Sequence, residues 1–168
     1  LTNKFQKSSD IPLMISIDGE WGVGMRLDSV HKFPWNMSLG AIKNNLILEK
    51  IGEDIGEQFN RLGIHMNFAP VLDINTNPKN PIIGNRSYGE NKINVSKKGI
   101  SFTKGIQSKN ILATAKHFPG HGDTSKDSHL TLPTIDFNKK RINEVEFYPY
   151  KQLIKNELSA IMIAHLNV

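Results

Sequence analysis

Residues 44–69 have the sequence NNLILEKIGEDIGEQFNRLGIHMNFA, and this stretch decides the fold because a helix pattern passes directly into a strand pattern. Apolar residues recur at spacings of three and four in its first two thirds, which predicts an amphipathic helix over about 44–62. Gly63 follows as a helix stop signal, and the short apolar run 64–69 is typical of a buried strand. One helix is therefore followed at once by one strand.

The same alternation continues on both sides of this stretch. The further elements that we expect are strands at 12–17, 111–115 and 160–164, a helix over about 94–108 and a helix that starts near Pro149. Strands that alternate with helices imply right-handed crossovers and a parallel sheet, so the predicted fold class is α/β, as a doubly wound sheet or a barrel. Two long loops, 70–90 and 116–136, are expected to carry function, because loops of that length rarely serve as simple connections.

The composition is that of an ordinary globular domain. The chain has 168 residues, of which 38% are hydrophobic and 22% are charged, so we expect residues 1–168 to form one domain. No apolar run approaches the roughly 18 residues of a membrane span, and the first ten residues lack the pattern of a signal peptide. The sequence contains no cysteine, which excludes disulfides and thiolate metal sites within it but leaves the cellular compartment open.

The charge pattern bears on nucleic-acid binding. A formal net charge of +5 would suit a nucleic-acid partner if the basic residues were clustered. The lysines are instead spread along the whole chain, so we expect a solvated surface and no nucleic-acid partner. Arginine is rare, and Arg26 and Arg86 both lie in glycine-flanked segments, which suggests that a guanidinium group is needed at those two positions.

Polar or ionisable residues stand at or just beyond the end of every predicted strand. They are Asp18, Asp73, the pair Lys116 and His117, and His165. Strand-to-loop transitions are often polar, which is the simplest account of any single one. Because the carboxyl ends of parallel strands meet at one edge, where barrel enzymes and open α/β sheets place their chemistry, we expect the set to form one active-site rim.

The segment richest in chemical groups is 116–129, with the sequence KHFPGHGDTSKDSH. It holds three of the six histidines, and its glycines and proline shape the backbone rather than supply core. Asp127 and His129 are two residues apart, a spacing at which the carboxylate can hold one ring nitrogen while the other faces a substrate. Such a pair can protonate a leaving oxygen and later deprotonate water, so both are candidate catalytic residues.

Two other interpretations of this segment stay open. His117 and His121 are four residues apart, and neighbouring carboxylates or histidines could complete a zinc-type cluster. That spacing brings two ligands together only in a helix, and Pro119 with its flanking glycines disfavours a helix here. A solvated polar loop with chance histidines is the second alternative.

A set of short motifs runs through the chain. The most specific is KHFPGHGDT at 116–124, followed by Asp127-Ser128-His129 and Leu132-Pro133. The others are Ile17-Asp18-Gly19-Glu20 before Arg26-Leu27, FAPVLD at 68–73, IGNRSYG at 83–89 and Ala164-His165. Together, and in this order, they resemble glycoside hydrolase family 3, specifically its β-N-acetylglucosaminidase branch, over essentially the whole chain.

The resemblance implies roles for individual residues. Those that would hold the sugar in the subsite of cleavage are Asp18, Arg26, Arg86, Lys116 and His117, with Asp73 and His165 in support. Asp127 and His129 match the acid/base dyad of this branch, where a histidine replaces the more common carboxylic acid. Neither a metal nor a cofactor is implied.

The chain departs from the family pattern in one segment. Residues 20–24 are EWGVG, where the common pattern is Glu-Gly-Gly-Arg-Val, so the first arginine of that pattern is absent. We expect Trp21 either to alter the loop or to add a stacking surface. Arg26 retains the second arginine position.

The resemblance also implies a fold and a mechanism. The fold would be a (β/α)8 TIM barrel, present here as about four strand-helix units, and the reaction would be retaining hydrolysis with an aspartate nucleophile on a later strand. We therefore expect this chain to be truncated at both ends, inactive alone and prone to self-association through exposed sheet edges. A metal-dependent barrel hydrolase and a non-catalytic sugar-binding piece are the alternative functions.

The expected substrate is a β-linked N-acetylglucosaminide, such as a cell-wall fragment. The sequence leaves open whether water or phosphate accepts the sugar. It also does not decide between the bacterial cytoplasm and the cell envelope.

Overall fold

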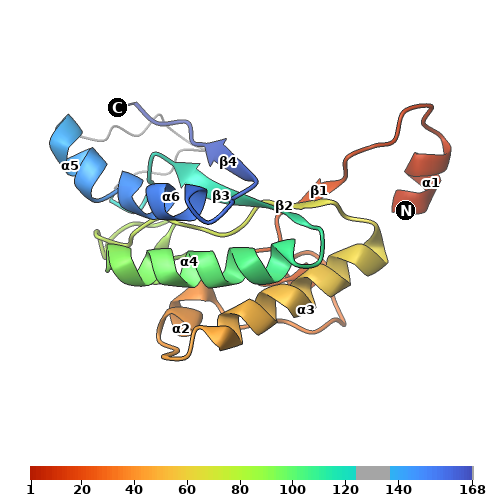
Figure 1. Ribbon diagram of the computed structural model, residues 1–168, viewed down its shortest axis with the longest axis horizontal. Coiled ribbons are helices and arrows are strands. Elements are labelled where there is room, and N and C mark those ends of the chain that lie inside the picture. The colour runs from red at the N-terminus through yellow and green to blue at the C-terminus, as the bar shows by residue number, and fades with distance from the viewer. Residues whose placement is uncertain (124–136, 168) are drawn as a thin grey trace.

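A computed structural model of the protein describes residues 1–123 and 137–167. Its strands are β1 Ser16–Ile17, β2 Met66–Asn67, β3 Leu112–Phe118 and β4 Ala160–Ile163. They form one parallel sheet in the order β1-β2-β3-β4, with Ser16 opposite Met66 and Met66 opposite Leu112 (Figure 1). The predicted α/β class with parallel strands is confirmed, and the four described strands do not close on themselves into a barrel.

Helices connect the strands and cover the sheet. They are α1 Thr2–Lys7, α2 Asn36–Gly40, α3 Leu46–Leu62, α4 Lys92–Gln107, α5 Lys139–Glu144 and α6 Phe147–Ile154, with 3-10 turns at Val23–Met25 and Gly84–Arg86. The three longest, α3, α4 and α6, are the helices that the sequence predicts, and Pro149 lies in the first turn of α6. α1 lies at the N-terminal side of the molecule, near the C-terminal end of α3, where Thr2 Oγ1 donates to Leu62 O at 2.6 Å (Figure 1). No helix in the described residues combines the length and the apolar character that a membrane span requires.

The third strand is longer than the sequence predicts. The expected strand ends at Ala115, whereas β3 continues to Phe118 and contains Lys116 and His117. The reason is backbone pairing, because the Lys116 N–H donates to Pro70 O at 3.0 Å and Leu72 N–H donates to Lys116 O at 2.7 Å. Both side chains are therefore held on a strand instead of a loop.

The boundaries of α3 and α4 follow from local chemistry. α3 ends at Gly63, whose φ of 66° is the left-handed conformation that glycine adopts without strain. α4 begins after Asn91, whose side chain accepts hydrogen bonds from the N–H groups of Ile93 and Asn94. Local sequence thus sets where α3 ends and where α4 begins.

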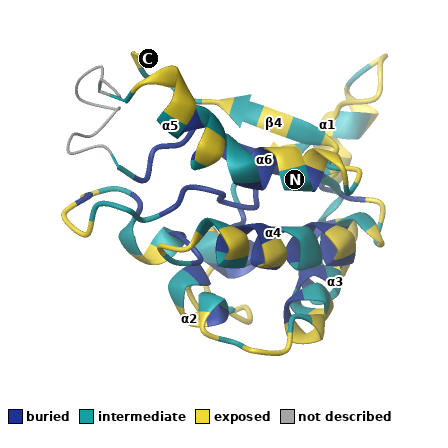
Figure 2. Cartoon of the chain, turned by 60° about the vertical axis from the view of Figure 1, so that its left-hand side comes forward, coloured by how far each residue is buried: buried dark blue, intermediate teal, exposed yellow. Residues whose placement is uncertain are grey.

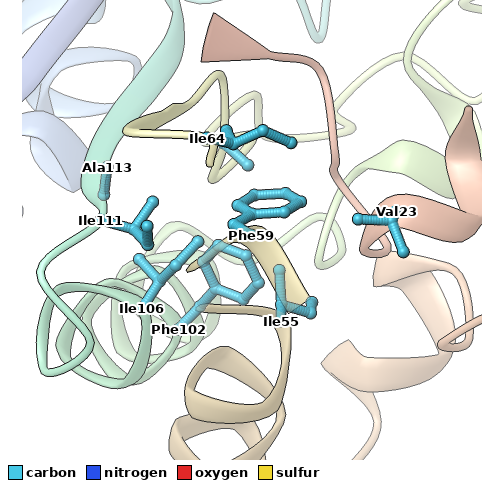
Figure 3. Close-up of a cluster of buried hydrophobic side chains, with 9 residues drawn as sticks. Val23, Ile55, Phe59, Ile64, Phe102, Ile106, Ile111 and Ala113 are labelled. Carbon is cyan, nitrogen blue, oxygen red and sulfur yellow. The ribbon is translucent and has the colours of Figure 1, made fainter. Parts of the chain in front are cut away.

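The core lies between the helices and the sheet. One cluster joins Ile55 and Phe59 of α3 to Phe102 and Ile106 of α4 and to Ala113 of β3 (Figure 3). α4 carries buried and exposed residues along its whole length, as an amphipathic helix must (Figure 2). This packing fixes the strands, and the strands fix the side chains that follow them.

Candidate active site

A pocket of about 700 Å³ lies at the carboxyl ends of the strands. The predicted residues that line it are Asp18, Arg26, Arg86, Lys116, His117 and His165. Asp18 follows β1, Lys116 and His117 lie near the end of β3, and His165 follows β4. The expected convergence of these side chains is confirmed, because parallel strands deliver their carboxyl ends to one edge.

A line of alternating charges forms the floor of the pocket. Lys116 Nζ lies 2.8 Å from Asp18 Oδ1 and 2.8 Å from Glu20 Oε1. Arg86 makes a bidentate salt bridge with the same Glu20, with its NH2 group 2.7 Å from Oε1 and its Nε 3.0 Å from Oε2. Each cation is thereby paired with at least one carboxylate, as burial of charge requires.

The two carboxyl groups are held in their ionised forms. Burial alone would raise the pKa of Glu20, but hydrogen bonds and charges from Arg86 and Lys116 outweigh it and keep that pKa below its usual value. Burial likewise opposes ionisation of Asp18, and Lys116 with Arg26 lowers its pKa overall. Both groups are therefore acceptors at neutral pH.

Asp73 lies behind the pocket wall and orients His117. Asp73 is fully buried, its Oδ2 is 2.6 Å from His117 Nδ1, and its Oδ1 accepts the backbone N–H groups of His121 at 2.6 Å and of His117 at 3.3 Å. Burial would raise the pKa of Asp73, but the interactions with His117 and these backbone N–H groups hold it below its usual value.

An ionised carboxylate only accepts hydrogen bonds, so His117 Nδ1 must carry the proton that it shares with Asp73. In the neutral ring the other nitrogen, Nε2, is then an acceptor, and Arg86 NH2 lies 3.3 Å from it. The supporting role expected for Asp73 corresponds to this contact with His117.

Arg86 is positioned by contacts of its own backbone. It ends the 3-10 turn Gly84–Arg86, and its carbonyl oxygen accepts from Asn36 Nδ2 of α2 at 2.7 Å. The next residue, Ser87, donates through Oγ to the backbone oxygen of Asp73 at 2.6 Å. The part of the loop that carries Arg86 is therefore tied both to α2 and to the earlier part of the same loop, which carries Asp73.

Arg26 and His165 lie nearer the solvent. Arg26 donates through NH2 to Asp18 Oδ2 at 2.9 Å and through Nε to the Asp18 backbone oxygen at 3.1 Å, and its side chain is 46% exposed. His165 is exposed at the pocket edge. Asp127 and His129, the predicted dyad, lie outside the described residues.

The zinc-type alternative was built from histidines and carboxylates of the same region. Within residues 1–123 and 137–167, no three His, Asp or Glu side chains come together in a way that would hold a metal ion. His117 Nδ1 contacts Asp73, and the His117 and His121 rings lie with their centroids 6.3 Å apart. Of the other ligands of that hypothesis, Asp18, Asp123 and His165 lie within the described ranges, and Asp127 and His129 fall outside them.

Sequence reasoning gave Glu20 no role, although the structure places it at the centre of the floor. Its only sequence signal was its place two residues after Asp18 in a motif. Trp21 and Trp35 also line the pocket, and the sequence suggests a stacking surface only at Trp21.

The sequence from residue 2 onward matches one family model. The model of the glycosyl hydrolase family 3 N terminal domain matches residues 2–168. The chain belongs to glycosyl hydrolase family 3. The family to which the motifs pointed is confirmed.

This family 3 chain is similar to named relatives and to solved structures. Beta-hexosaminidase A of Pseudoalteromonas piscicida is 40% identical over 96% of this chain and 28% of its own length. A solved family 3 β-N-acetylglucosaminidase from Paenibacillus sp. strain FPU-7 has 42% identity and a TM-score of 0.94, covering 99% of this chain and 33% of that one. A solved β-glucoside phosphorylase, BglX, has 26% identity and a TM-score of 0.91, covering 95% of this chain and 29% of that one.

These similarities confirm the fold class as the (β/α)8 barrel type of family 3, of which the described strands form a part. The family 3 chain spans only about a third of the length of these relatives.

Proposed function

We propose that the protein to which this chain belongs is a retaining glycoside hydrolase that removes β-linked N-acetylglucosamine. The observation that carries this proposal is the charged pocket floor, in which Asp18, Lys116 and Arg86 converge with Glu20 between them. The names of the β-hexosaminidase and β-N-acetylglucosaminidase relatives support the same substrate class.

The floor offers a sugar both acceptors and donors. A carboxylate has about four acceptor sites, so Asp18 can accept hydroxyl protons while it keeps its contacts with Lys116 and Arg26. An ammonium group has three donors, of which Lys116 directs one each to Asp18 and Glu20. Charge-assisted hydrogen bonds of this kind fix both the position and the orientation of a ring.

The chemical steps in this proposal need two further groups. His129, oriented by Asp127, protonates the leaving oxygen and then deprotonates the attacking acceptor, and an aspartate on a later strand attacks the anomeric carbon. In a retaining mechanism the covalent intermediate forms as the leaving group departs and is then cleaved by the acceptor. The described residues bind and orient the sugar.

The test uses the full-length protein and a chromogenic β-N-acetylglucosaminide. We expect hydrolysis with kcat/KM far above that for the matching β-glucoside, and a loss of about 10² to 10⁴-fold in kcat for His129→Ala. Because one relative is a phosphorylase, the product is assayed with and without phosphate, and a sugar 1-phosphate would make the enzyme a phosphorylase. Preference for the glucoside, or full activity of the variant, would contradict the proposal.

A further inference from the structure

Polar side chains of the loop after β2 hold the segment that follows β3. Asn80 is buried, and its Nδ2 donates to the backbone oxygen of His121 at 2.7 Å. Thr76 Oγ1 donates to Asp123 Oδ1 at 2.8 Å, and Asn77 Nδ2 donates to the Asp123 backbone oxygen at 3.4 Å. The first and the last residue of the segment 121–123 are therefore both fixed to this loop.

The backbone of the same segment also packs against the loop. Gly122 has no room for a Cβ atom, because the backbone oxygen of Ile74 lies where that atom would be. The N–H of Asn77 donates to the Gly122 oxygen at 3.4 Å, and the N–H of His121 donates to Asp73 Oδ1 at 2.6 Å. The position of 121–123 is thus defined by main-chain packing as well as by side chains.

Burial does not account for the contact between Thr76 and Asp123. Both residues are only half-buried, so water could satisfy the hydroxyl and the carboxyl group without this bond. The contacts of the buried Asn80 are different, because a buried amide must be hydrogen-bonded wherever it lies. The bond from Thr76 therefore calls for an explanation other than the satisfaction of buried polar groups.

The place of Asp123 in the chain supplies that explanation. His121, two residues earlier, lines the pocket, and Asp127, the first residue of the predicted dyad, stands four residues later. Four residues of chain span at most about 14 Å, so fixing Asp123 limits how far Asp127 can lie from the pocket. Holding a catalytic group near its reaction partner lowers the entropic part of the barrier.

We propose that Thr76, through its hydrogen bond to Asp123, is a positioning residue for the acid/base dyad. Thr76 is not among the described residues that line the pocket, so it acts on the proton transfer and leaves the binding of the sugar unchanged. This inference rests on the proposed function, which assigns the proton transfer to His129 and Asp127, and adds to it a residue that orients the dyad.

The experiment compares two substrates of the full-length protein that differ in their need for an acid. The phenyl β-N-acetylglucosaminide has a poor leaving group that must be protonated, whereas the 2,4-dinitrophenyl glycoside loses its leaving group without a proton. The value of kcat/KM reports the step in which the leaving group departs. We expect Thr76→Val, which replaces the hydroxyl by a methyl group, to lower kcat/KM about tenfold for the phenyl glycoside and less than about twofold for the dinitrophenyl glycoside.

Matched variants separate positioning from folding. Thr76→Ser keeps the hydroxyl and should retain most of the activity on the phenyl glycoside. In an Asp123→Ala background, Thr76→Val should add no further loss, because the two groups act as one pair. Thr2→Val is the control, since it removes a hydroxyl that donates to Leu62 O at 2.6 Å away from the pocket. His129→Ala is the reference and should show a larger loss with the same preference for the dinitrophenyl glycoside.

The outcomes distinguish this role from the proposed function. An equal loss on both substrates in Thr76→Val would show that Thr76 supports the fold or the floor, and full activity on the phenyl glycoside would show that the dyad does not depend on it. Either result overturns the positioning role, and the proposed function stands as long as His129→Ala shows the selective loss. A His129→Ala protein without that selectivity would overturn the proposed acid/base step, and the positioning role with it.

Discussion

Lys116 and Arg86 meet on a single oxygen atom, Oε1 of Glu20, at 2.8 Å and 2.7 Å respectively. Two cations this close would repel each other strongly if the carboxylate between them were absent. Glu20 is itself unexposed, so water cannot replace it as a counter-charge. The position of both sugar-binding candidates therefore depends on Glu20.

Replacing Glu20 should test that dependence. Glu20→Gln keeps the shape but removes the charge, and we expect the free energy of unfolding to fall by about 3 kcal/mol, because a buried pair broken on one side leaves an uncompensated charge. Urea unfolding measures the change. Glu57→Gln is the matched control, since Glu57 forms an exposed ion pair with Lys109, and it should change stability little. Equal changes in the free energy of unfolding in the two variants would show that the buried ion pairs of the floor stabilise the fold no more than an exposed pair does.

The same variant predicts a pH dependence. Glu20 has a pKa below its usual value of 4.5 in the folded protein, so the unfolded chain binds its proton more readily. Its stabilising effect is therefore fully present above pH 4.5 and is lost as the pH falls through the lowered folded pKa. We expect the difference in unfolding free energy between wild type and Glu20→Gln to shrink below pH 4.5, as measured by urea unfolding at a series of pH values. A difference that grows on acidification would contradict this assignment.

Arg86 should matter for binding of the transition state. Arg86→Ala removes donors that face Glu20 and His117, and we expect kcat/KM for an N-acetylglucosaminide to fall by a factor equivalent to about 2 to 4 kcal/mol. Arg86→Lys should not restore the activity, because an ammonium group cannot make the bidentate contact with Glu20. Arg61→Ala, on the exposed face of α3, is the control. An unchanged kcat/KM would remove Arg86 from the site.

Asp73 should control which ring nitrogen of His117 carries the proton. In Asp73→Asn the amide oxygen can accept the backbone N–H of His121, but the amide NH2 then faces His117 Nδ1 and moves the ring proton to Nε2. That proton would point at Arg86. We expect kcat/KM to fall at least about tenfold, and ¹⁵N NMR of the ring to report the changed tautomer.

Asp54→Asn, in an exposed pair with Lys50, provides the comparison for this variant. A wild-type tautomer together with lost activity would mean that Asp73 acts in some way other than by orienting the ring.

The parts of the fold that were predictable are those with a repeated pattern. α3 shows four turns of apolar spacing and ends at a glycine, so its place could be read from the sequence. α2 and α5 have five and six residues, which is too short for a helical period to appear. The sequence predicts that β3 stops at Ala115, and pairing with the segment after β2 and with β4 extends it to Phe118.

The predictable part of the site consists of the residues at the carboxyl ends of the parallel strands. Asp18 and His165 follow β1 and β4, Lys116 lies near the end of β3, and the parallel arrangement alone brings the three to one edge. The role of Glu20 could not be predicted from the sequence, because its partner Arg86 lies 66 residues away on a loop whose path no local pattern describes. The same holds for Trp35, whose ring centroid lies 4.1 Å from that of Trp21, because no local pattern describes the path of the segment between them.

The close packing of α4 against α3 provides the last prediction. A methyl group added at Gly105 of α4 would lie 2.0 Å from the backbone oxygen of Glu49 in α3. Helix propensity alone would make Gly105→Ala stabilising by up to about 1 kcal/mol. The clash is with backbone and cannot be relieved by rotating a side chain, so we expect a loss of about 3 kcal/mol or more in the free energy of unfolding.

The sign of the change measured by urea unfolding therefore decides between the two effects. Ser101→Ala, at a half-buried position of the same helix, is the control and should change stability by less than about 1 kcal/mol. A Gly105→Ala protein more stable than wild type would show that α3 and α4 do not approach as closely as described. The strand ends that α3 and α4 support would then be free to shift, and the convergence of Asp18 with Lys116 would lose its structural basis.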